Sequence, residues 1–231
     1  AFDICSSLTT IVIPDSVTDI GEGLFFCCSS LTSITLPNSM KTIGEMAFYD
    51  CRSLTAITIP NSVTSIGKRA FEDCSSLTTI TIPNSVKMIG DYAFIGCSSL
   101  TAITIPDSVT IIGEGAFYRC SSLASIAIPN SVITVKDSAF YGCESLTAIT
   151  IGNRVTSIED YAFDGCKKLT SITLPDSVTS VGECAFYDCS SLTSITFQGT
   201  IAQWEEIILQ DDWNNEVPAK VVHCTDGDVE I

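Results

Sequence analysis

Apolar residues recur in this chain with a period of 23 residues. With each unit numbered from residue 1, positions 2, 5, 8, 11, 13, 17 and 20 are apolar in nearly every unit. Phenylalanine occupies position 2 nine times, at residues 2, 25, 48, 71, 94, 117, 140, 163 and 186. No insertion or deletion changes this interval up to Phe197. A constant period is what the stacked coils of a solenoid require, because each coil lies on its neighbour.

Each unit predicts the same short elements. The unit reads A-F-x-x-C-S-S-L-T-x-I-T-I-P-x-S-V-T-x-I-G-E-x. Leu-Thr-x-Ile-Thr-Ile alternates apolar and small polar residues, which predicts a short strand that the following proline ends. Successive copies of this strand would form a parallel, in-register sheet. Ser-Val-Thr-x-Ile predicts a second short extended segment. Gly-Glu-x-Ala-Phe predicts a single helical or 3₁₀ turn, in which the dipole would favour acids such as Glu22 and Asp91.

One coil alone cannot fold. Burial of its seven apolar side chains contributes about 10–20 kcal/mol. Ordering the backbone costs about 1–2 kcal/mol per residue, over 23 residues. Stacking supplies the missing ladder hydrogen bonds and a continuous core. The sequence therefore predicts a right-handed solenoid of nine coils over residues 1–197, with covered ends.

Residues 198–231 leave the period and are predicted to form a C-terminal capping segment. Within them, Ile201–Leu209 can form a short amphipathic helix. Asp-Gly between two apolar runs, residues 220–224 and 229–231, favours a β-hairpin. At the other end the chain starts in mid-unit at Ala1-Phe2, without a recognisable cap. We therefore expect a fragment or processed piece of a longer protein, or a first coil that pairs with something else.

The repeat resembles the BspA-like leucine-rich repeat, a 23-residue class found in bacterial and some protozoan surface proteins. The motif A-F-x-x-C-x-x-L-x-x-I-x-I-P-x-S-V-x-x-I-G recurs nine times over residues 1–197. The tail is similar to the segment that closes such arrays in bacterial members, through the runs 197–200, 202–204, 213–215 and 222–228. The resemblance implies an α/β leucine-rich-repeat fold in a curved solenoid. It also implies extracellular or cell-surface display, often as one module of a larger protein, and some members are adhesins.

The twelve cysteines invite metal or disulfide interpretations. Nine of them are position 5 of the repeat, which offers no close C-x₂-C ligand pair. Parallel inward side chains in neighbouring coils rarely meet the disulfide dihedral. The pattern favours a ladder of buried thiols. Cys27, Cys184 and Cys224 lie out of phase, and we expect free thiols there too.

Catalytic and metal chemistry find little support. His223 is the only histidine, and it lies in the predicted capping segment. Asp226, Asp228 and Glu230 could offer oxygen ligands to calcium, but the spacing of a calcium loop is incomplete. A hairpin turn is favoured there. The repeat of the resembling family contains no catalytic residues. We therefore predict no enzyme, and no catalytic, cofactor or metal residue.

Charge and hydropathy exclude other classes. The chain has 11 basic and 27 acidic side chains, a formal net charge of −16. This disfavours a nucleic-acid partner, because phosphates reward basic surfaces. The longest apolar run is far shorter than the ~20 residues that a membrane helix needs. No signal peptide is visible at the start, and the apolar fraction of 45% argues against disorder.

Two rows of outward positions are candidates for binding. Position 12 forms a lane of small hydroxyl side chains: Thr35, Thr58, Thr81, Thr104, Thr150 and Thr173. Such a face suits an extended partner. It also suits a merely solvated strand, and a flat threonine grid is a feature of ice-binding solenoids. Position 3 carries aromatic residues: Tyr49, Tyr118, Tyr141 and Tyr187. Their composition is typical of interfaces, but they can equally cover the edge of the coil.

We expect an extracellular or cell-surface module for recognition or adhesion. Its partner would be a host extracellular-matrix protein or a microbial surface protein, contacted through the solenoid face. The alternative is a structural spacer in a larger surface protein. A specific site in a near-identical repeat would show as a break in the pattern. The breaks are Leu24–Cys28, Lys136–Ser138, Gly152–Arg154 and Lys167-Lys168.

Overall fold

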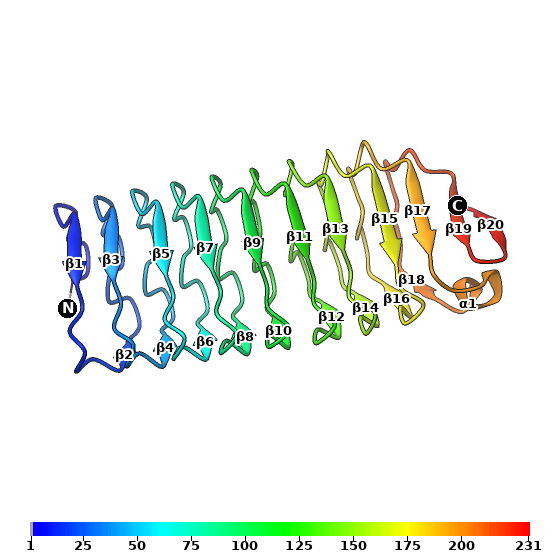
Figure 1. The fold of residues 1–231 in the computed structure, drawn as a ribbon. Helices are drawn as coiled ribbons and strands as arrows, with labels where there is room; N and C mark the ends of the chain where they lie inside the picture. Colours follow the sequence, from blue (N-terminus) through cyan, green and yellow to red (C-terminus); the bar gives the residue numbers. More distant parts are fainter. Residues whose placement is uncertain (1) are drawn as a thin grey trace.

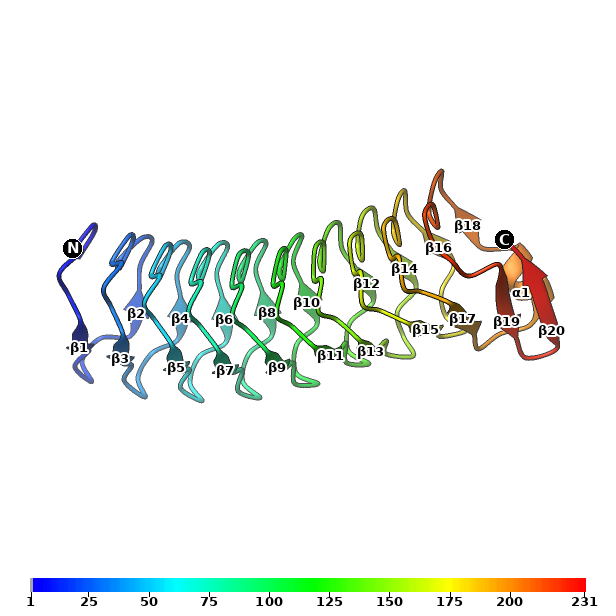
Figure 2. The same cartoon turned by 90° about the horizontal axis from the view of Figure 1, so that it is seen from above.

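The computed structural model describes residues 2–231 as an elongated stack of coils, with the two chain ends at opposite ends of the stack (Figures 1 and 2). Each of the first eight units contributes two strands, and the ninth contributes one. The first row is β1 (Thr10–Val12), β3 (Ser33–Thr35), β5 (Ala56–Thr58), β7 (Thr79–Thr81), β9 (Ala102–Thr104), β11 (Ser125–Ala127), β13 (Ala148–Thr150), β15 (Ser171–Leu174) and β17 (Ser194–Phe197). The second row is β2 (Asp19–Ile20), β4 (Thr42–Ile43), β6 (Ser65–Ile66), β8 (Met88–Ile89), β10 (Ile111–Ile112), β12 (Thr134–Val135), β14 (Ser157–Ile158) and β16 (Ser180–Val181).

The strands pair in parallel and in register, as the period predicts. Ile57 lies opposite Ile80 and Thr58 opposite Thr81, an offset of one unit. The first row is divided between β3 and β5 and again between β13 and β15, and the second between β10 and β12. In β5 the central isoleucine points inward and its two neighbours are exposed. The alternation along each strand therefore separates a core face from an open face.

The predicted helical turn at Gly-Glu-x-Ala-Phe is not confirmed. Among residues 2–231 the coils contain strands and turns, and α-helix occurs only in the C-terminal segment. Successive amides there alternate between two kinds of partner. The Phe48 N–H donates to the Ala70 carbonyl in the next coil, at 2.8 Å. The Tyr49 N–H donates within its own coil to Met46, at 3.1 Å. In a helix every amide N–H would donate to a carbonyl of the same segment. Here every second N–H donates to the neighbouring coil instead. Met46 and Asp50 have φ of 51° and 58°, which also breaks helical geometry.

The acids at position 22 consequently have a different role from the predicted one. The Asp91 Oδ1 atom accepts a hydrogen bond from the Glu114 N–H at 3.0 Å. Asp160 Oδ1 accepts one from the Glu183 N–H at 2.8 Å. Both bonds join a coil to the next coil. These carboxylates satisfy backbone donors between coils, not a helix dipole.

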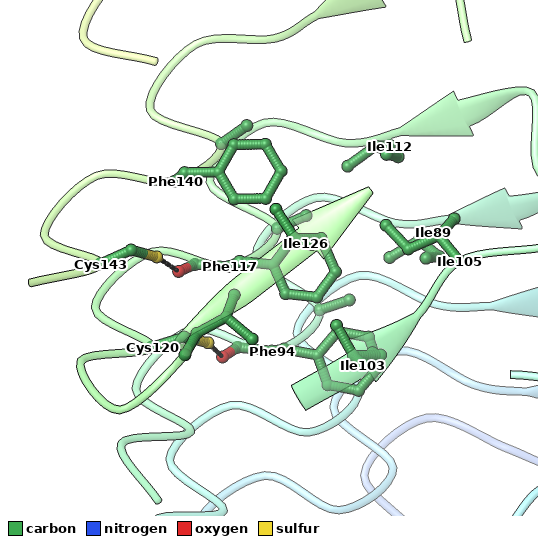
Figure 3. Packing of buried hydrophobic residues seen from close by; sticks show 14 of the residues in the cluster. Ile89, Phe94, Ile103, Ile105, Ile112, Phe117, Cys120, Ile126, Phe140 and Cys143 are labelled. Atoms are coloured by element: carbon green, nitrogen blue, oxygen red, sulfur yellow. Dashed lines mark hydrogen bonds between the residues drawn. The ribbon is translucent and has the colours of Figure 1, made fainter. Parts of the chain in front are cut away.

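The core is a set of identical side chains stacked along the axis. The rings at position 2 stack from Phe2 to Phe186, with centroids 5.2–5.5 Å apart. The position-5 thiols lie beside this stack (Figure 3). The Cys120 Sγ atom donates to the Phe94 carbonyl at 3.2 Å, and Cys143 bonds to Phe117 in the same way. From the second coil on, each coil therefore contributes one aromatic ring and one hydrogen-bonded thiol to a continuous interior.

Glycine at position 21 marks the closest approach of neighbouring backbones. A Cβ atom on Gly90 would lie 2.7 Å from the carbonyl carbon of Gly67. Lys136 replaces this glycine, and the second row breaks there, between β10 and β12. Glu159 also replaces this glycine, yet β12 and β14 pair in register, so loss of the glycine alone does not account for the break. The irregular run at Lys136–Ser138 is thus a structural discontinuity.

The C-terminal segment contains α1 (Ile201–Glu205), β18 (Ile208–Leu209), β19 (Val221–Cys224) and β20 (Gly227–Glu230). The helix predicted over Ile201–Leu209 is shorter in the structure, where α1 ends at Glu205. Ile208 and Leu209 instead extend the second row as β18. Thr200 and Gln203 form the capping box at its start. The predicted hairpin is confirmed by the antiparallel pair β19–β20. The segment thus adds one irregular coil to both rows.

Candidate functional site

The threonine lane runs along the open face of the first row. Thr35, Thr58, Thr81, Thr104, Thr150 and Thr173 are all exposed. In-register pairing places Thr58, Thr81 and Thr104 one strand spacing apart, about 4.8 Å. Ala127 interrupts the lane and leaves a shallow hollow of about 340 Å³ beside Thr104 and Thr150. The lane is therefore a regular hydroxyl surface with one gap.

The tyrosines form a second row, on the turn segments that connect the two rows of strands. The Tyr118 and Tyr141 rings stack with centroids 4.5 Å apart. Tyr49 stacks on Phe26 at 4.6 Å. The Tyr187 hydroxyl donates to Glu216 of the C-terminal segment at 3.3 Å. All four tyrosines are half-buried, which supports the interpretation that they cover the edge of the coil.

The structure also shows a hollow that the sequence analysis missed. It has a volume of about 450 Å³ and opens on the turn segments of the last five units. Gly142 and Gly165, at position 4 of neighbouring units, line it together with Tyr141, Asp164 and Lys167. Gly96 lines it at the same position, and the remaining units carry larger residues there. The signal that could have located it is the group of three glycines at position 4, two of them in neighbouring units beside an acid in the aromatic row.

Asp164 is the most unusual side chain of this hollow. It is the one buried charged residue among residues 2–231, with 8% of its surface exposed. Burial raises the pKa of its carboxyl to about 6, and the charges of Asp188 and Glu216 add to this effect. Lys167 opposes the rise in this pKa. The same carboxylate is the main cause that raises the pKa of the Tyr141 hydroxyl.

The two cations of the hollow already have partners. Lys167 Nζ lies 3.2 Å from Glu144 Oε1 and 3.7 Å from Asp188 Oδ2. The Arg119 guanidinium lies over the Tyr118 ring, 5.4 Å from its centroid. Neither cation forms an ion pair with Asp164 in the described part of the chain. The buried carboxylate is therefore left without a counter-charge of its own.

The remaining candidates for chemistry are structural. All twelve cysteines are free thiols, eight of them buried. Burial raises the pKa of the Cys97 thiol well above its ordinary value, which makes it a poor nucleophile. In the hairpin, Asp226 Oδ1 accepts from the Ile201 N–H at 2.8 Å, and Asp228 Oδ1 lies 2.8 Å from His223 Nδ1. These contacts give both carboxylates a local role.

The described residues also bear on metal binding and membrane spanning. Within residues 2–231, no three His, Cys, Asp or Glu side chains converge in a geometry suited to a metal ion. Over the same residues, no helix has the length and apolar character needed to cross a membrane.

Comparison with protein families identifies the repeat. The model of the BspA type leucine-rich repeat region matches residues 1–124 and 110–212, in six copies. The chain belongs to this family. A BspA-type repeat explains the constant 23-residue period, the phenylalanine and cysteine stacks, and the absence of insertions over nine units.

Solved structures of bacterial leucine-rich repeat proteins are similar to this BspA-type array. One, from T. pallidum, is 34% identical with a TM-score of 0.65, over 69% of this chain and 77% of that chain. A leucine-rich cell surface protein of Faecalibacterium prausnitzii is 36% identical with a TM-score of 0.59, over 88% of this chain. A leucine-rich repeat protein of Bacteroides ovatus is 29% identical with a TM-score of 0.69, over 93% of this chain. This chain covers 63% and 60% of the latter two. No curated protein matches.

Proposed function

We propose that this BspA-type array is an extracellular or cell-surface recognition module that binds a protein partner through its solenoid surface. The partner would be a host extracellular-matrix protein or a microbial surface protein. The observation that carries the proposal is the threonine lane. Six exposed hydroxyl side chains recur at one position of the repeat over a continuous buried core, and Thr58, Thr81 and Thr104 pair in register. Such a surface offers repeated hydrogen-bond donors and acceptors to an extended partner without loss of conformational entropy.

Further support comes from family and charge. The similar protein of Faecalibacterium prausnitzii is described as a cell surface protein. The net charge of −16 is spread over turns and the C-terminal segment, which keeps a repetitive sheet soluble outside a larger assembly. The half-buried tyrosine row adds aromatic contact area next to the hollow. We also propose that residues 198–231 cap the array, because Trp213 packs edge-on against Phe186 at 6.1 Å.

The direct test is a binding screen with the purified array. It would be exposed to panels of immobilised extracellular-matrix proteins and microbial surface proteins, and binding measured by surface plasmon resonance. We expect saturable binding to at least one protein of the panel. The proposal fails if the isolated array binds nothing while the full-length surface protein binds through another region.

A structural spacer is the second candidate, favoured by the near-identity of the units. It can be separated from recognition by removing two whole units, residues 47–92, which joins Met46 to Ala93 in phase. Recognition predicts weaker binding, because the deletion removes Thr58 and Thr81 from the lane. A spacer predicts that binding of the full-length protein survives this shortening unchanged. Circular dichroism would verify that the shortened array stays folded.

A further inference from the structure

Asp164 is the acid of its row that lies between two tyrosine-bearing units, and its side chain has no direct partner among residues 2–231. Position 3 is aromatic in the flanking units, as Tyr141 and Tyr187. Asp164 lies in this row with only 8% of its surface exposed. The hydrogen bonds and ion pairs of residues 2–231 give its side chain no partner. A buried carboxylate normally requires a donor or a counter-charge. The carboxylate of Asp164 instead lines the open hollow, and an unpartnered acid in such a place is a candidate for function.

The space in front of this carboxylate is made by the chain itself. Gly142 and Gly165 adopt φ of 66° and 71° at position 4. Asp50, Asp73 and Asp188 take the same position with φ of 58°, 55° and 49°. The backbone there therefore accepts a side chain, and the two neighbouring glycines leave room that the aspartates fill in their own units. The resulting volume, about 450 Å³, lies in the range of ligand sites.

The charges around the space favour a cation. Lys167 is shared by Glu144 and Asp188, and Arg119 lies over Tyr118. Neither neutralises Asp164. A metal ion is disfavoured, since within the described residues no three acidic, His or Cys ligands converge and calcium takes six or more oxygens. An ammonium group needs only one carboxylate, and an aromatic neighbour such as Tyr141 adds to its binding.

We propose that the hollow at Asp164 binds the side chain of a lysine presented by the partner protein. Its ammonium group pairs with the Asp164 carboxylate, and its aliphatic stem lies over Gly142 and Gly165 beside Tyr141. This proposal rests on the proposed recognition function for the identity of the partner. The site itself is a property of the isolated array. The lysine supplies the counter-charge that the Asp164 carboxylate lacks within the chain. It would also let this acidic molecule distinguish one basic partner from others.

The test is an NMR titration of the ¹⁵N- and ¹³C-labelled protein with acetyl-Gly-Lys-Gly-amide. We expect saturable shifts of the Gly142 and Gly165 amides and of the Asp164 carboxyl carbon. The matched peptide acetyl-Gly-Gln-Gly-amide should leave these signals unchanged. The variant Asp164→Asn should bind the lysine peptide about tenfold more weakly or worse, since a charge-assisted hydrogen bond is lost. Asp107→Asn removes the same charge from an exposed turn and should bind like the parent.

A second variant keeps the test decisive. Gly165→Asn fills the hollow with a residue that tolerates positive φ, and it should also abolish the shifts while Asp164 stays in place. Equal shifts with the glutamine peptide, or equal affinity in Asp164→Asn and Asp107→Asn, would overturn the proposal. The titration needs no partner protein. A negative panel screen with a positive titration therefore refutes only the recognition function, and the reverse result refutes only the lysine site.

Discussion

Each residue of the array has equivalent residues one unit before and one unit after it. Phe117 therefore stacks between Phe94 and Phe140, with centroids 5.4 and 5.5 Å away. The sequence predicts such positions well, because a repeated side chain fixes its own surroundings. Asp164 could not be predicted as buried in the same way. Its environment depends on glycines at position 4 in two units and on charges contributed by a third unit and the C-terminal segment.

Stability should depend on pH through Asp164. Its pKa is raised from 3.8 to about 6 in the folded state, so the folded chain binds this proton more tightly than the unfolded chain. The free energy of unfolding should therefore fall as the pH rises from about 4 to about 6. Asp164→Asn should raise Tm by about 2–4 °C at pH 7.5. This corresponds to about 1 kcal/mol, since solvent at the open side screens part of the cost. The advantage should shrink to roughly half at pH 5.

Thermal unfolding at the two pH values measures this effect. Asp107→Asn is the control, and we expect no change in its Tm because Asp107 is exposed. A lower Tm for Asp164→Asn at pH 7.5 would show that the carboxylate is stabilised by a partner in the folded protein.

Thiol accessibility provides a second test at this scale. Cys5, Cys27, Cys184 and Cys224 are half-buried, and the other eight thiols are buried in the stack. Brief treatment of the native protein with iodoacetamide should modify only the first four, as counted by mass spectrometry. Denaturant should release the remaining eight. Modification of Cys97 as fast as Cys184 would contradict the closed core.

At the scale of elements, strands were predictable and turn segments were not. The strand of each unit follows from alternation, as in β5. The turn segments follow from bonds between coils, which force positive φ on residues as different as Met46 and Arg69. No local residue propensity indicates these positive φ values. The same applies to α1, which stops at Glu205 because the following residues are needed as β18 beside β16.

The close approach at position 21 predicts a sharp difference between two glycines. A Cβ atom on Gly90 would meet the Gly67 backbone at 2.7 Å, whereas one on Gly21 meets nothing within 4 Å. Gly90→Ala should lower the free energy of unfolding by about 1–3 kcal/mol. Gly21→Ala, at the same repeat position, should leave it nearly unchanged. Urea denaturation measures both, and equal losses would contradict the account of the glycine.

The proposed cap predicts a large effect of one tryptophan. Trp213 is buried and contacts both Phe186 and Trp204, with centroids 6.1 and 5.9 Å away. Trp213→Ala should destabilise the array by about 3–5 kcal/mol. Glu205→Ala, at an exposed position of the same segment, is the control. If the denaturation midpoint of Trp213→Ala equals that of the control, residues 198–231 do not act as a cap.

At the scale of the whole molecule, repetition provides stability and departures from it provide specificity. From the second unit on, the stack buries the position-2 phenylalanines and position-5 cysteines in one cluster, and its outer face is nearly uniform. A partner can therefore bind along the lane at several registers. Asp164 and the hollow break this uniformity at a single place, which would fix one register.

The most direct test of recognition compares two sets of lysine substitutions in the same three units. One variant carries Thr35→Lys, Thr58→Lys and Thr81→Lys on the lane. The control carries Asn38→Lys, Asn61→Lys and Asn84→Lys, which are exposed in the turns after the strands. Both add three positive charges. Surface plasmon resonance against the partner found in the screen should show at least about tenfold weaker binding for the lane variant, and unchanged binding for the control. Equal affinities of the two variants would contradict recognition through the lane.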